Sequence, residues 1–163
     1  MELTSNNLAR DPKGGPLWVL LRPPIVFLES ILLGIAMNWV WPLPFVPSAI
    51  VLLGPVVTLC ASLLFLFSVR TFRDAGTPVR GTERTTTIVR TGPYRFTRNP
   101  IYLSFILFVL GLAVLLNNPW LLVTLVPAVA FIAAVVIPRE ERFLERNFAE
   151  QYPSYKAAVR RWL

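Results

Sequence analysis

Two long apolar stretches dominate the pattern of hydrophobic and polar positions along this chain. Glu29 is the only charged residue between positions 23 and 69, and there is no charged residue between positions 99 and 138. About 20 apolar residues in a helix cross the hydrocarbon of a bilayer, so each stretch is long enough for a helical hairpin. The pattern predicts an all-α membrane protein with about four transmembrane helices.

Turn signals divide the two stretches into spans. We expect membrane spans at residues 24–41, 48–69, 100–116 and 119–137. At ~1.5 Å per residue these helices reach roughly 25 to 33 Å, enough to cross a core of ~30 Å. Asn99 before Pro100 and Asn118 before Pro119 are predicted helix N-caps, and Pro55 predicts a kink in the second span.

The basic residues predict the orientation of the chain. All 16 Lys and Arg residues fall in the N-terminal segment, the segment 70–98 and the tail from residue 139 onward. Because positive residues favour the cytoplasmic side, both termini and the central loop are expected in the cytoplasm. The polar arm 1–16 lacks the pattern of a cleavable signal peptide, so an integral, multi-pass protein is expected.

The tail, residues 139–163, predicts an amphipathic cap helix. Its apolar residues recur every three or four positions: Leu144, Phe148, Tyr152, Tyr155, Val159 and Trp162. This stripe should lie against the bundle or the membrane surface, with a break near Pro153.

Composition excludes several classes of chemistry. The chain has no histidine and one cysteine, Cys60, which we expect to be buried within a span, so histidine triads, zinc sites and other cysteine-rich metal sites are excluded. The net charge of +7 comes from residues that flank apolar spans, where they face lipid head groups rather than nucleic acid.

Groups of opposite charge are expected to meet at one membrane face. The segment 70–98 holds seven arginines and leads into the helix that begins near Asn99, whose free N–H groups would suit an anion. Glu140 and Glu141 follow the fourth span on the same side of the membrane. Together they predict a site for a ligand that carries both charges.

The segment 92–102, GPYRFTRNPIY, followed by Glu140 and Glu141 and then by Phe148, Tyr152 and Tyr155, closely resembles the isoprenylcysteine carboxyl methyltransferase and phospholipid methyltransferase family. The resemblance covers residues 72–162 and implies one membrane-embedded methyltransferase domain, 1–163, that uses S-adenosylmethionine. It implies donor contacts at Thr86, Thr87, Ile88, Val89, Tyr94, Asn99, Pro100, Ile101, Tyr102 and Glu140. We assign the catalytic positions to Arg98, Glu140 and Glu141.

The expected reaction needs few special groups. The chain lacks the glycine-rich fingerprint of a Rossmann donor site. Transfer from a sulfonium requires alignment and exclusion of water more than a strong acid or base. A membrane pocket offers both to a lipophilic or amphiphilic acceptor, and the sequence leaves open whether oxygen, nitrogen or sulfur is methylated.

Simpler interpretations stay open beside these. Arg95 and Arg98 could bind lipid phosphates, and Glu140 and Glu141 could stabilise the first turn of the tail helix. Glu29, an ionisable residue within a span, is a candidate substrate contact. The alternative function is that of a small transporter or a non-catalytic membrane scaffold. In a transporter, Glu29 would be the ion-coupling group.

Overall fold

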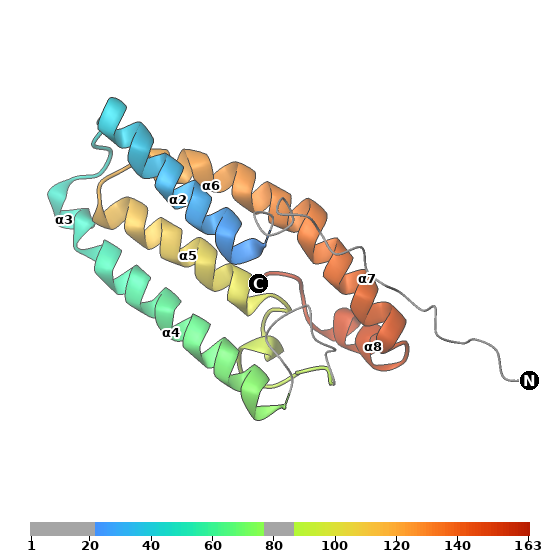
Figure 1. Cartoon of the computed structure of the whole chain (residues 1–163). Coiled ribbons are helices and arrows are strands. Elements are labelled where there is room, and N and C mark those ends of the chain that lie inside the picture. Colours follow the sequence, from blue (N-terminus) through green and yellow to red (C-terminus); the bar gives the residue numbers. More distant parts are fainter. Residues whose placement is uncertain (1–21, 77–86) are drawn as a thin grey trace, which may run out of the picture.

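The computed structural model describes residues 22–76 and 87–163 of the chain, and these residues form helices and connecting loops without a β-strand. Antiparallel helices lie side by side in a bundle (Figure 1). The bundle consists of α2 Pro23–Val40, α4 Leu53–Asp74, α5 Pro100–Leu115 and α6 Trp120–Phe131. The closest packing does not follow the predicted hairpins: α2 packs mainly against α6 and α4 mainly against α5, so the two halves of the sequence interleave.

The second predicted span, 48–69, is a longer and interrupted helix. A short helix, α3 Ser48–Val51, precedes α4, which continues to Asp74. The interruption lies at Leu52, three residues before Pro55. Because Pro55 has no N–H, it cannot bond the carbonyl of Val51, and the helix loses its ladder at that point. The predicted distortion is therefore present, but it lies one turn before the proline.

Three helical stretches are long and apolar enough to cross a membrane, and they mark this chain as a membrane protein. They are Pro23–Val40, Ser48–Asp74 and Trp120–Asn147. The expected third span, 100–116, forms α5, an apolar helix of 16 residues that falls short of the length of the others. It packs against α2, α4 and α6, so it is the central helix of the bundle.

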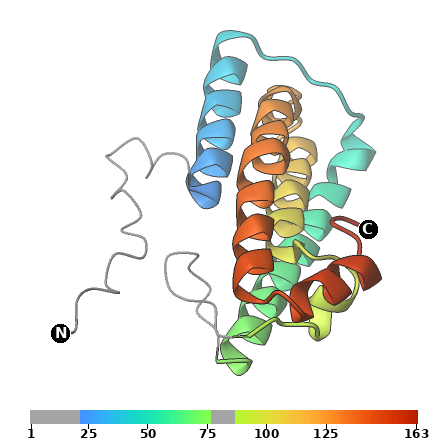
Figure 2. The same ribbon diagram turned by 90° about the vertical axis from the view of Figure 1, so that its right-hand side faces the viewer.

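The last span leads without a break into the charged tail. A π-helical turn, η2 Ile132–Val136, joins α6 to α7 Ile137–Asn147. Pro138 lies at the start of α7 and cannot donate to the carbonyl of Ala134, which explains why the α-helical ladder changes here. The same long helix therefore carries Glu140 and Glu141 to the end of the bundle that holds α8 (Figure 2).

The tail folds back on the bundle as two helices, α7 and α8. After α7 the chain turns at residues 148–150, and α8 spans Gln151–Ala158. The break lies a few residues before the predicted position because Pro153 falls in the first turn of α8, where proline is tolerated. Tyr152 and Tyr155 are buried, as expected of the apolar stripe.

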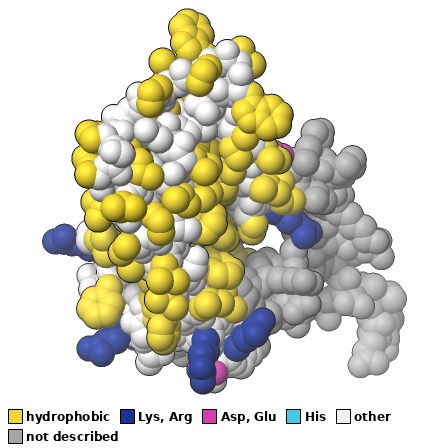
Figure 3. Space-filling model, turned by 90° about the vertical axis from the view of Figure 1, so that its left-hand side faces the viewer, with side chains coloured by type: hydrophobic (Ala, Val, Ile, Leu, Met, Phe, Trp, Pro, Cys, Tyr) yellow, Lys and Arg dark blue, Asp and Glu magenta, His cyan; other side chains and the backbone are white. Residues whose placement is uncertain are grey.

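The outer surface of the bundle is apolar where a bilayer would surround it. Large exposed side chains of α2 and α4 include Leu32, Leu33, Leu59 and Phe67. Figure 3 shows hydrophobic side chains over most of the visible face, with Lys and Arg in the lower half of the view. Cys60 is exposed on α4, so the expectation that it is buried is wrong.

Candidate functional site

Tyr102 and Glu140 join the two halves of the predicted motif. Tyr102 lies in the first turn of α5, and its hydroxyl donates a hydrogen bond of 2.6 Å to Oε1 of Glu140 in α7. Tyr102 is buried, whereas Glu140 keeps an exposed side. The carboxylate is therefore held from one side and remains accessible from the other.

Glu141 is the buried centre of a cluster of charges beside this pair. Its carboxylate lies 3.0 Å from Nη1 of Arg98, 2.8 Å from Nη2 of Arg161 and 3.7 Å from Nζ of Lys156. Lys156 also pairs with Glu145 at 2.8 Å, and this hydrogen bond raises the pKa of Lys156. Arg98, Arg161 and Lys156 thus lie close to Glu140, Glu141 and Glu145, so positive and negative groups are side by side at this end of the bundle.

Arg98 has one N–H group without a hydrogen-bond acceptor in the part of the chain that the structure describes. Its side chain is 10% exposed, and its Nη1 lies 3.4 Å from the hydroxyl of Tyr152. Its Nε is buried and has no hydrogen-bond partner among the described residues. Because buried polar atoms are nearly always paired, this N–H is a candidate contact for an anionic group of a ligand.

The start of α5 offers further donors. Asn99 occupies the N-cap position, but its side chain makes no capping bond, so the predicted side-chain cap is wrong. Its Nδ2 instead donates to the carbonyl of Arg161 at 3.0 Å. Within the described ranges, the N–H groups of Ile101 and Tyr102 have no acceptor, as expected at an uncapped helix start.

The loop before α5 is attached to the cap. Arg90 lies over the ring of Tyr155, 5.8 Å from its centroid, and donates to the carbonyl of Gln151. The hydroxyl of Tyr155 donates to the carbonyl of Tyr94 at 2.8 Å. Tyr94 lies in the 3₁₀ turn η1 Gly92–Arg95. Its ring packs edge-on against that of Phe72, with the two centroids 4.9 Å apart.

The other predicted donor contacts fall in or near this loop. Thr87 and Ile88 are half-buried, while Val89, Tyr94 and Pro100 are buried. Val89 and Tyr94 therefore pack into the protein from the loop, and Pro100 does so from the start of α5. Thr86 lies outside the described residues.

Both cap tyrosines are neutral hydrogen-bonding groups. Burial, with a smaller contribution from Tyr152, raises the pKa of Tyr155 to about 12. Burial and then the negative charge of Glu141 raise the pKa of Tyr152. At neutral pH these hydroxyls keep their protons and can donate to the groups around them.

Glu29 does not join the charged groups of the site. It lies exposed on α2, and no described contact joins it to Glu140 or Glu141.

Arg161, which the sequence pattern did not single out, contacts both Asn99 and Glu141. Its position follows from the return of the chain end onto α5, which the spacing of apolar residues does not reveal.

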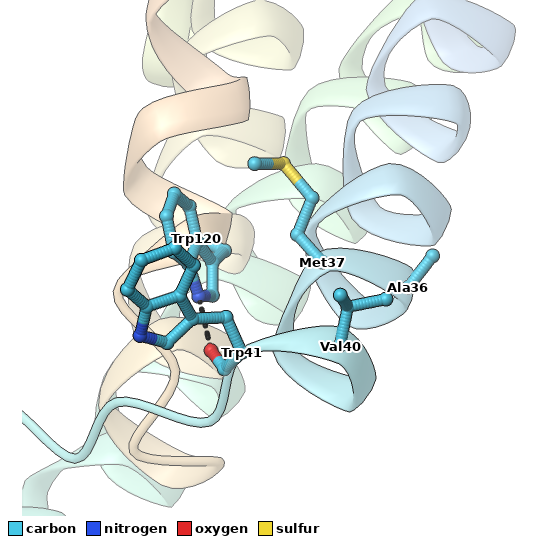
Figure 4. A pocket seen from close by; sticks show the side chains of 5 residues that line it. All are labelled: Ala36, Met37, Val40, Trp41 and Trp120. Atoms are coloured by element: carbon cyan, nitrogen blue, oxygen red, sulfur yellow. Dashed lines mark hydrogen bonds between the residues drawn. The ribbon is translucent and has the colours of Figure 1, made fainter.

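A pocket of about 300 Å³ lies at the opposite end of the bundle (Figure 4). It is lined by Ala36, Met37, Val40, Trp41 and Trp120. Trp120 and Glu140 lie on one long helix, and 20 residues at 1.5 Å per residue separate them by about 30 Å. The pocket offers no titratable side chain, so it is distinct from the charged site.

The chain is similar in sequence to one protein family and to individual known proteins. The family model for phospholipid methyltransferase matches residues 49–151. Protein-S-isoprenylcysteine O-methyltransferase A of Arabidopsis thaliana is 38% identical over 78 residues, which cover 44% of this chain and 36% of that relative. An uncharacterised protein of Haemophilus influenzae is 36% identical over 63 residues, covering 39% of this chain and 100% of that relative.

No solved structure matches the chain. The chain spans about a third of the length of the Arabidopsis relative. The family match covers most of the bundle, from α3 to the first residue of α8, and includes both Tyr102 and Glu140. This protein therefore belongs to the phospholipid methyltransferase family.

Proposed function

We propose that this chain transfers a methyl group from S-adenosylmethionine to a lipophilic or amphiphilic acceptor at the cytoplasmic face of a membrane. The observation that carries the proposal is the hydrogen bond between Tyr102 and Glu140, because it brings the family's two sequence-distant motif segments to one place. The name of the Arabidopsis relative, an isoprenylcysteine O-methyltransferase, supports methyl transfer and a lipid-like acceptor.

The charged and hydrogen-bonding groups of the candidate site fit the charges of S-adenosylmethionine. Its carboxylate would lie near the open N–H groups of Ile101 and Tyr102 and the unpartnered Nε of Arg98. Its ammonium or ribose hydroxyls would meet the accessible side of Glu140. Both kinds of partner lie at the same end of the bundle, which a zwitterionic ligand requires.

The remaining proposed donor contacts surround these groups. Thr87, Ile88 and Val89, with Thr86 beyond the described part, would border the donor from the loop side, while Tyr94, Asn99 and Pro100 would shape the wall. We assign Glu141 to the support of Arg98 rather than to direct contact, because its carboxylate is buried and already paired. Glu29 stays a candidate for acceptor contact only.

The bound donor would supply an activated methyl carbon, which leaves sulfur for an oxygen, nitrogen or sulfur atom of the acceptor. The protein's own part is to hold both molecules in line and to exclude water. Tyr102 and Tyr152 present neutral hydroxyls and rings beside the charged cluster, so they can restrict solvent there. The apolar faces of the neighbouring helices would admit an acceptor from the bilayer.

The same proposal includes the orientation in the membrane. We infer that α5 is the fourth span, because this apolar helix lies at the centre of the bundle although it reaches only about 24 Å. Arg98, Arg161 and Lys156 lie at the end of the bundle opposite the uncharged turns. The positive-inside rule then places the site, the central loop and both termini in the cytoplasm.

A transfer assay tests the proposed function. The full chain, reconstituted in lipid nanodiscs, would be incubated with methyl-labelled S-adenosylmethionine and separate panels of phospholipids, prenylated cysteine compounds and small lipophilic thiols. We expect label in one acceptor class, lost in Glu140→Gln and kept in Glu150→Gln, a matched change at an exposed glutamate outside the charged cluster. No label in any panel, together with no donor binding, would contradict the proposal.

A further inference from the structure

The last residues of the chain, 159–163, form a strap that leaves α8 and returns to the start of α5 (Figures 1 and 2). Its first residue, Val159, is extended, with φ −124° and ψ 131°. Trp162 packs against the hydrophobic core cluster and anchors the far part of the strap. The chain end is therefore a packed element of the site and not a loose tail.

The strap's backbone holds the segment that precedes α5. The N–H of Arg98 donates to the carbonyl of Arg160 at 3.0 Å. The carbonyl of Arg161 accepts from Oγ1 of Thr97 at 2.9 Å and from Nδ2 of Asn99 at 3.0 Å. Three hydrogen bonds thus fix residues 97–99 against two consecutive carbonyl groups.

The side chain of Arg161 holds the other half of the site. Its Nη2 and Nε donate to the two carboxylate oxygens of Glu141, at 2.8 and 3.2 Å. A two-point contact between guanidinium and carboxylate fixes orientation as well as distance. Arg161 therefore links α7 to the start of α5, through its side chain on one side and its carbonyl on the other.

We propose that Arg161 is a positioning residue of the donor site, which sets the spacing between Glu140 on α7 and the open N–H groups of α5. This inference rests on the proposed function. Arg161 acts through Glu141, the neighbour of Glu140 in the chain, and through Asn99, which lies next to the start of α5. Small displacements of either side would separate groups that have to contact one ligand together.

The neighbouring arginine provides a matched control. Arg160 has an exposed side chain and contributes its backbone carbonyl, which survives substitution. For the full chain in nanodiscs, calorimetry with S-adenosylmethionine should show an affinity about tenfold weaker in Arg161→Ala. Arg160→Ala should stay within about twofold of the wild type, and Arg161→Lys should recover part of the loss because it keeps the charge without the fork.

A second measurement needs no donor. Hydrogen exchange should be faster at the amides of Arg98 and Asn99 in Arg161→Ala than in Arg160→Ala, while the amides of α4 exchange as in the wild type. Unchanged exchange at Arg98 and Asn99 would overturn the anchoring role. The α4 amides also report whether each variant is folded.

The outcomes separate the two proposals. A wild-type chain that does not bind S-adenosylmethionine overturns the proposed function, while hydrogen exchange still tests the strap. If the wild type binds and Arg161→Ala binds equally well, the positioning role alone is overturned. Tighter binding by Arg161→Ala would also overturn it, because the strap would then compete with the donor.

Discussion

The hydroxyl of Tyr102 donates a 2.6 Å hydrogen bond to Glu140, 38 residues further along the chain. Removing it in Tyr102→Phe should leave the carboxylate less well oriented and weaken S-adenosylmethionine binding several-fold. Titration of donor into the reconstituted protein measures this effect. The melting temperature should change by no more than a few degrees, because Glu140 is exposed to solvent and can bond water instead. Equal donor affinity in both proteins would contradict an orienting role for this hydroxyl.

Replacement of Glu141 should act mainly on stability. Glu141→Gln leaves the buried guanidinium of Arg98 without its opposing charge, and such a loss costs roughly 3 kcal/mol. Denaturant titration of the solubilised protein would report the free energy of unfolding. Arg95→Ala, a change at an exposed arginine of η1, should stay within about 0.5 kcal/mol of the wild type. Similar values for both variants would show that the cluster contributes little.

The variant Asn99→Asp distinguishes a side chain that caps α5 from one that donates a hydrogen bond to the carbonyl of Arg161. Asp is as good an N-cap as Asn, so Asn99→Asp would be harmless if the side chain capped α5. The structure has Nδ2 donating to the carbonyl of Arg161, which a carboxylate cannot replace. We therefore expect a loss of about 1 to 3 kcal/mol in the free energy of unfolding. Asn147→Asp, at an exposed site on α7, is the control and should change little.

Close packing of α4 against α5 depends on a glycine. A Cβ built on Gly111 would lie 2.4 Å from Oγ1 and 2.7 Å from the backbone N of Thr58. Gly111→Ala should force the helices apart and cost about 1 to 3 kcal/mol, measured as unfolding in detergent. The neighbouring Leu110→Ala removes an exposed side chain and should cost less. The opposite order would contradict this packing.

The buried phenol of Tyr155 predicts a loss of stability in alkali. Its pKa is raised to about 12, whereas an unfolded tyrosine titrates near about 10. The folded state holds this proton more tightly, so its contribution is complete below about pH 10 and is lost as pH rises toward about 12. In Tyr155→Phe the free energy of unfolding should fall less steeply over that range. A slope equal to that of the wild type would contradict the assignment.

Much of the fold could be predicted from the sequence because charge and proline placement mark the ends of helices in a membrane. The uncharged turns near Pro47 and Asn118 and the charged ends after Val69 and Pro138 predicted roughly where the helices begin and end. They did not predict that α2 packs on α6 and α4 on α5, because the sequence pattern does not show which helices are neighbours. The break at Leu52 was misplaced because the consequence of a proline falls on the carbonyl four residues earlier.

The contact between Tyr102 and Glu140 was predictable because family resemblance supplied the pairing of the two distant segments. The contacts that residues 159–163 make with α5 and α7 were not predictable. Arg161 reaches Asn99 and Glu141 because the chain reverses after α8, and neither hydrophobic spacing nor charge order along the tail contains that reversal. The side chain of Asn99 was predicted to cap α5 because the sequence does not show that the carbonyl of Arg161 lies beside it.

The most direct test is binding of S-adenosylmethionine by the full chain in nanodiscs, measured by calorimetry for wild type, Glu140→Gln and Glu150→Gln. We expect one site per chain, an affinity at least about tenfold weaker in Glu140→Gln, and unchanged affinity in Glu150→Gln, because Glu150 is exposed and lies outside the charged cluster. Equal affinity in all three proteins, or no binding by the wild type, would contradict this expectation.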